Sequence, residues 1–292
     1  MGFSEMLSAA MAVITAFFSG IFYGIVGQPA TAQLSADLKR DGTPKKYFTL
    51  SFDDGITQDE KIMEICRKYG FDSVTFNINS NLCGENWAWV ADMVNCPGLV
   101  HQRFTEEQLK NGIYNGFDVA AHAANHASIK AFDTDPFGLY RELEKDADRI
   151  YRLTGTKPLG MAWPGGDTEY TEKSVENVYR YTSLRYARGT TATHTFDLPR
   201  YFLRWMPTCS VVEPDLLQQA QTFLDAPCES DMLFYVWGHG YELDAFNLYD
   251  TLEQLIKMMS VRDDVVCVSN TEFYLLFRDE IPACTLDEAK KK

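Results

Sequence analysis

The sequence predicts a single α/β domain with a mainly parallel sheet that closes toward a barrel of seven or eight strands. Short apolar, β-branched and aromatic segments alternate with segments whose apolar residues recur at helical spacing. Parallel strands need crossover connections, so this alternation indicates helices packed outside one sheet. The 292 residues suffice for one large domain with a substantial core, and seven or eight such units fit a barrel better than an open sheet.

The first half of the domain is predicted to contain four strands and the helices between them. Strands are expected at 47–52, 73–78, 118–121 and 159–163, and helices at 57–69, from 105, from 136 to 154 and at 171–182. Thr105 opens a capping-box pattern, and Gly70 and Gly155 are expected helix stops. The segment 79–103 has no regular pattern and contains two tryptophans, and loops of this length in compact domains are often functional.

The second half continues the same alternation with shorter segments. Strands are expected at 184–187, 202–206, 232–237 and 265–268, and helices from 214, at 248–259 and at 271–277. The tail from Pro282 is polar, ends in three lysines and is expected to be frayed.

The two ends of the chain are expected to lie outside this domain. Residues 6–26 are mostly apolar and Ala30-Thr31-Ala32 has the form of a signal-peptidase site, so residues 1–32 are expected to be a signal peptide or an N-terminal anchor. A linker at 33–46, a catalytic domain at 47–281 and a polar tail at 282–292 follow. This favours a secreted or envelope-anchored protein. A cytoplasmic protein is the alternative, since Met1–Glu5 contains no Lys or Arg.

Charge and cysteine content narrow the classes of partner. The formal net charge of −14 argues against nucleic acid and against an anionic membrane surface, so membrane contact is expected only through an N-terminal anchor. The seven cysteines are scattered without a CxxC pair, which favours free thiols over a disulfide framework.

Polar groups that carry chemistry follow four of the predicted strands. They are Asp53-Asp54-Gly55, His122 with His126, Pro164-Gly165-Gly166, and His239 between two glycines. Each pattern alone is common in turns and loops, but the carboxyl ends of barrel strands meet at one face, so their joint placement predicts one site. One carboxylate and two imidazoles suit a catalytic divalent metal, the second carboxylate suits a base, and His239 suits an acid.

These residues resemble the motifs of the polysaccharide deacetylase family, carbohydrate esterase family 4, which shares the NodB homology domain. Ser51–Gly55 is similar to its T/S-F-D-D-G motif, and His122–His126 to its H-S/T-x-x-H motif. The resemblance implies the distorted (β/α) barrel of that family. It also implies Asp53 as base, His239 as acid, and Asp54, His122 and His126 as ligands of one divalent metal. Zinc is expected first, with cobalt, nickel, manganese or iron as alternatives.

The reaction that the resemblance implies is removal of acetyl groups, most of all N-acetyl groups, from a glycan or oligosaccharide, with metal-bound water as nucleophile. Two alternatives stay open: a hydrolase of a small cyclic amide or ureide, and a carbohydrate-binding protein with a retired site. The sequence departs from the family at Ala123, which replaces a hydroxyl residue, at Gly238, which replaces a leucine, and at the third motif, which lacks its arginine. Arg188 is the candidate replacement for that arginine.

Supporting residues for the substrate or the oxyanion are expected among the prolines and tryptophans near the strand ends. The candidates are Trp87, Trp89, Trp163, Pro164 and Trp205. Packing in the core is the competing interpretation for the tryptophans.

Overall fold

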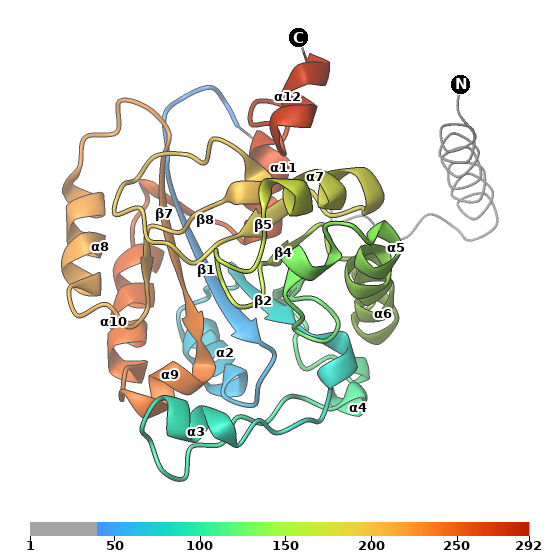
Figure 1. The fold of residues 1–292 in the computed structure, drawn as a ribbon. Coiled ribbons are helices and arrows are strands. Elements are labelled where there is room, and N and C mark those ends of the chain that lie inside the picture. Colours follow the sequence, from blue (N-terminus) through green and yellow to red (C-terminus); the bar gives the residue numbers. More distant parts are fainter. Residues whose placement is uncertain (1–39, 292) are drawn as a thin grey trace.

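The computed structural model describes residues 40–291 (Figure 1). The expected signal peptide or anchor at 1–32 lies outside these residues, so it stays a prediction. Within residues 40–291, no helix has the length and apolar character needed to cross a membrane. The seven cysteines all fall in this part of the chain and all are free thiols, as predicted.

One sheet of eight strands organises the domain, and every strand pairing in it is parallel. The strands are β1 (Lys46–Asp54), β2 (Val74–Ile78), β3 (Asp118–Ala121), β4 (Gly160–Ala162), β5 (Tyr186–Arg188), β6 (Cys209–Ser210), β7 (Met232–His239) and β8 (Val265–Cys267). Their order is β5-β4-β3-β2-β1-β7-β6, with β8 paired to β1. The sheet curls with helices outside it, which confirms the predicted single-domain distorted barrel.

Helices connect the strands and cover the outer face of the sheet. The longer ones are α2 (Asp59–Lys68), α6 (Lys145–Thr154), α7 (Glu172–Tyr181), α8 (Leu216–Asp225), α10 (Tyr249–Ser260) and α11 (Asn270–Phe277). Shorter ones are α3 (Trp89–Met93), α4 (Glu106–Lys110), α5 (Pro136–Leu139), α9 (Gly240–Ala245) and α12 (Thr285–Lys291). The predicted capping box at Thr105 opens α4, and Gly155 ends α6 in the left-handed conformation at φ 80°.

β1 is central because all nine of its residues are buried and it pairs with three other strands. Phe48, Leu50 and Phe52 alternate along it and belong to the main apolar core. The residues between them are polar: Thr49 donates a hydrogen bond to Asn270 Oδ1, and Ser51 accepts one from Asn77. This face of β1 is apolar at Tyr47, which belongs to a second buried cluster, and becomes polar from Thr49 toward Asp53.

The strand predicted at 202–206 is wrong for residues 202–204, whereas Trp205 forms an isolated parallel bridge with Arg188 of β5. Phe202–Arg204 forms a short 3₁₀ turn, because the amides of Phe202 and Leu203 donate to the carbonyls of Pro282 and Ala283 instead of to a sheet neighbour. The same pairing orders the tail that was expected to be frayed. Ala283 and Cys284 are buried and α12 follows them.

Candidate active site

Two consecutive left-handed residues turn the chain at the end of β1. Asp54 has φ 83° and Gly55 has φ 66°. A Cβ on Gly55 would lie 2.8 Å from the Cγ2 of Ile78, so only glycine fits without displacement. In Figure 1, the arrows of β1 and β7 both point toward α3 and α9, at the end opposite α12. Asp53 pairs in register with His239 there.

Asp54, His122 and His126 form the candidate metal site. Each offers one ligand atom, and these atoms lie within 4.8 Å of one another. His122 follows β3 directly and donates from Nδ1 to the carbonyl of Ala162 at 2.9 Å, which leaves its Nε2 as an acceptor. The Nε2 atoms of both histidines lie 3.9 Å from Asp54 Oδ1. The left-handed backbone of Ala123 (φ 60°) and His126 (φ 53°) makes the turn that aims both rings at Asp54.

The protonation states of these groups fit a metal. Burial lowers the pKa of His122, and burial together with the neighbouring His122 lowers the pKa of His126 to about 4, so both rings are neutral at pH 7. Burial acts to raise the pKa of Asp54. The hydrogen bond from His101 and the charges around the site outweigh it and hold that pKa well below its usual range. Two neutral imidazoles and one carboxylate suit zinc and its neighbours among the divalent transition metals.

Asp53 is held by two side chains from other strands. Arg188, the last residue of β5, forms an ion pair with Asp53 Oδ2 and is fully buried. Asn77 of β2 donates to Asp53 Oδ1 at 2.9 Å. Burial acts to raise the pKa of Asp53, but Arg188, His122 and His239 together lower it. The arginine absent from the third motif therefore has a counterpart in space, on the strand next to the one that carries the motif.

His239 is supported by the helix that it opens. It is the N-cap of α9, its backbone amide donates to Glu242 Oε2 at 2.7 Å, and its Nδ1 lies 3.3 Å from the same oxygen. Burial acts to lower the pKa of His239, yet Glu242 and the two aspartates raise it to about 9. The ring is therefore cationic at neutral pH.

The predicted supporting residues are divided between the core and the rim of the site. Trp163 and Trp205 are 1% and 0% exposed, and Trp163 stacks on Tyr170 at 4.2 Å, so both rings belong to the core. Pro164 is buried as well. Trp87 is half-buried and meets the edge of the His126 ring at 5.4 Å. Trp89 is 54% exposed and is the most solvent-exposed of these five residues.

Four residues near the catalytic groups were not predicted: Asn77, His101, Arg103 and Glu242. Asn77 is an amide residue in the buried strand Val74–Ile78, where Thr75 is the other polar residue, and a buried amide is a usable signal. Glu242 follows His239 at capping-box spacing. His101 and Arg103 close the segment 79–103, but their contact with Asp54 is a tertiary one that no local pattern indicates.

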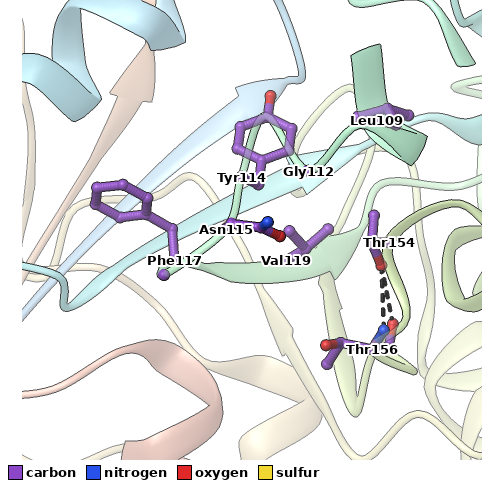
Figure 2. Close-up of a pocket in the computed structure, with 9 residues that line it drawn as sticks. Leu109, Gly112, Tyr114, Asn115, Phe117, Val119, Thr154 and Thr156 are labelled. Atoms are coloured by element: carbon purple, nitrogen blue, oxygen red, sulfur yellow. Dashed lines mark hydrogen bonds between the residues drawn. The ribbon is translucent and has the colours of Figure 1, made fainter. Parts of the chain in front are cut away.

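A small cavity of about 80 Å³ lies elsewhere, at the start of β3 (Figure 2). Its lining runs from Leu109 to Val119 and includes Thr154 and Thr156, which bond to each other. The lining residues include no carboxylate, imidazole or thiol. The hydroxyl of Tyr114, the ionisable group of the lining, donates to Asp59 Oδ2, so we place the candidate site at the opposite ends of the strands.

Two solved structures with this fold are described as a "putative" and a "probable" polysaccharide deacetylase. One, from Mycobacterium smegmatis, matches 88% of this chain and 98% of its own length, with 11% identity and a TM-score of 0.55. Another, from Pseudomonas aeruginosa, matches 81% of this chain and 92% of its own length, with 8% identity and a TM-score of 0.53. At these identities, the likeness concerns the fold alone.

The sequence itself gives the family. Residues 40–187 match the polysaccharide deacetylase family model, and the chain belongs to this family. That places it among the carbohydrate deacetylases, which are hydrolases. No curated protein sequence matches the chain significantly.

Proposed function

We propose that the protein is a metal-dependent hydrolase that removes acetyl groups, principally N-acetyl groups, from an acetylated glycan. The observation that carries the proposal is the convergence of Asp54, His122 and His126 beside Asp53 and His239, on the fold of this family. Zinc is the proposed metal, held by Asp54 Oδ1 and the Nε2 atoms of the two histidines. A divalent metal bound there would polarise the acyl oxygen and lower the pKa of water.

The chain's own residues supply the proton transfers. Asp53 accepts a proton from the water that attacks the acyl carbon, while Arg188 and Asn77 hold both of its oxygens in place. His239 is cationic and gives its proton to the leaving nitrogen as the C–N bond breaks. The products are acetate and a free amine. Glu242 orients the His239 ring and keeps it protonated.

The position of Trp89 supports a glycan as substrate. Its ring is widely exposed and lies 5.5 Å from Trp87, which itself touches the ring of His126. An exposed indole beside a polar site is suited to packing against a sugar ring. The sequence features of residues 1–32 favour action on glycans outside the cytoplasm, and we propose a secreted or envelope-anchored enzyme on that ground.

The test combines metal analysis with acetate release from N-acetylated chitooligosaccharides, and compares Asp53→Asn with Asp54→Asn. We expect Asp53→Asn to lose roughly 10²–10⁴-fold in turnover while keeping its metal, because the three ligands remain. Asp54→Asn is expected to lose the metal as well. Metal loss in Asp53→Asn would show that the two roles are reversed. Hydrolysis of cyclic amides without acetate release would refute the proposed deacetylase activity.

A further inference from the structure

Both carboxylate oxygens of Asp54 are already engaged by one segment of the chain. His101 Nε2 donates to Oδ2 at 2.9 Å, and Arg103 Nη2 donates to Oδ1 at 3.0 Å. The two residues are 1% and 2% exposed, so these contacts are shielded from water. Gln102 lies between them in the sequence but donates in another direction, to the carbonyl of Gly84 at 2.8 Å. The alternation of an extended segment thus aims His101 and Arg103 at one carboxylate.

The two oxygens of Asp54 have different surroundings. Oδ1 is the oxygen that lies 3.9 Å from the Nε2 atoms of His122 and of His126. Oδ2 is the oxygen bound by His101. Oδ1, which also accepts from Arg103, therefore faces the two imidazoles, whereas Oδ2 is bound by His101 and lies away from them.

The two donors are held in turn. The Arg103 guanidinium lies 3.8 Å from the centroid of a Trp87 ring, and the Trp87 and His101 rings stack nearly parallel, 5.7 Å apart at 11°. Arg103 Nη2 also lies 3.4 Å from Asn79 Oδ1, and the Asn79 amide donates to the carbonyl of Ala123 at 2.8 Å. Asn79 thereby links this group to the turn between the two histidines, where the sequence lacks the usual hydroxyl residue.

We propose that His101 and Arg103, backed by Trp87, are positioning residues that restrict Asp54 to a one-oxygen metal ligand: His101 occupies Oδ2, and Arg103 fixes the orientation of the carboxylate from Oδ1. A carboxylate that binds through both oxygens takes one more coordination position than one that binds through a single oxygen. Occupying Oδ2 with His101 reserves that position for water or for the acyl oxygen. Hydrogen-bonded partners of this kind typically change metal affinity by about 10–100-fold when removed. The inference rests on the proposed function, because it requires that Asp54 binds a metal.

The experiment titrates the metal-free full-length protein with Co²⁺, followed by visible absorption, and measures the affinity for Zn²⁺ by calorimetry. His101→Ala removes the donor, His101→Gln keeps an N–H donor, and Gln102→Ala disturbs the same segment without touching Asp54. We expect His101→Ala to bind either metal about 10–100-fold more weakly and to shift the Co²⁺ spectrum toward a higher coordination number. His101→Gln is expected to recover most of the affinity, and Gln102→Ala to match the wild type.

Two outcomes overturn the inference and differ from a failure of the proposed function. Either His101→Ala keeps the wild-type affinity and spectrum, or His101→Ala and Gln102→Ala weaken binding equally. If the wild type binds neither metal, the proposed metal site fails first and this inference falls with it. Should His101→Ala not fold, Arg103→Lys decides the question. This substitution keeps the positive charge but loses the planar guanidinium group. We expect it to weaken metal binding roughly tenfold. Unchanged metal binding would show that the segment plays no part.

Discussion

Each aspartate at the end of β1 has its own arginine, and each arginine lies against a tryptophan. Arg188 pairs with Asp53 and lies 4.3 Å from a Trp237 ring centroid, while Arg103 pairs with Asp54 beside Trp87. Adjacent buried carboxylates repel each other and lose hydration, so both stay ionised only with nearby cations or donors. The two arginines supply these from different segments of the chain, β5 and the segment 79–103, and the adjacent carboxylates can take different roles.

A prediction for a single residue concerns Glu242, which lies beside His239. Its carboxylate, with the two aspartates, raises the pKa of His239 to about 9 against the effect of burial. A raised pKa means that the charged ring stabilises the fold below about pH 6.5, and that this stability is lost as the pH rises through 9. Glu242→Gln should therefore lower the pKa of His239, as read from NMR titration of the metal-free protein. The alkaline limb of the pH–rate profile should move to lower pH in the loaded enzyme.

The matched control is Glu272→Gln, because Glu272 makes the same capping-box contact at the start of α11, with Ser269 in place of a histidine. It should leave the pKa of His239 unchanged. An unaltered His239 titration in Glu242→Gln would show that the two aspartates alone hold the ring protonated.

At the scale of elements, the sequence predicted best those segments that are specified locally. The strand expected at 118–121 is β3 residue for residue, and the helix expected at 171–182 is α7 with its two caps. Apolar periodicity and capping residues act within a few positions of one another, so they are readable in one sequence. Phe202–Arg204 has strand-like composition, but its backbone partners are at Pro282 and Ala283, some 80 residues away. No local pattern contains that pairing.

The turn after β1 allows an element-scale prediction. Gly55→Ala places a side chain at φ 66° and brings its Cβ against Ile78 of β2. A left-handed conformation costs about 1–2 kcal/mol and overpacking about 1–3 kcal/mol, so we expect a loss of about 2–5 kcal/mol in the free energy of unfolding. Urea denaturation followed by circular dichroism measures it.

Gly42→Ala is the control for the backbone contribution. Gly42 has a similar φ of 82°, but nothing lies within 4 Å of a Cβ placed there. Gly42→Ala should therefore lower the free energy of unfolding only by the cost of the left-handed conformation, about 1–2 kcal/mol. Equal losses in the two variants would contradict the packing argument at Ile78.

For the whole molecule, metal binding and folding stability should be linked. A ligand that binds only the folded state at 100 times its dissociation constant adds about 2.7 kcal/mol. In a domain of this size, that corresponds to a rise of roughly 5–10 °C in Tm. We expect this rise on adding Zn²⁺ to the metal-free protein, measured by differential scanning calorimetry. His126→Ala, which lacks one of the three ligands, should show little of it.

The sequence also predicted the sheet of the whole molecule and the face on which the candidate site lies. The carboxyl ends of parallel strands lie at the same face, so residues that follow different strands come together there. Asp53 and His239 are 186 positions apart and still meet in register. The contacts of Asp54 with His101 and Arg103 could not be predicted in the same way. They depend on the path of the 25-residue segment 79–103, which contains α3 and which strand order does not determine.

The paired arginines also affect the order in which the enzyme is assembled. Asp53 and Asp54 pair with Arg188 and Arg103, which belong to the chain itself, so part of their charge is offset whether or not a metal is bound. The chain is therefore expected to fold first and to take up its metal afterwards. The metal supply of the compartment would then set the active fraction of the enzyme, while the yield of folded protein would depend on the chain alone.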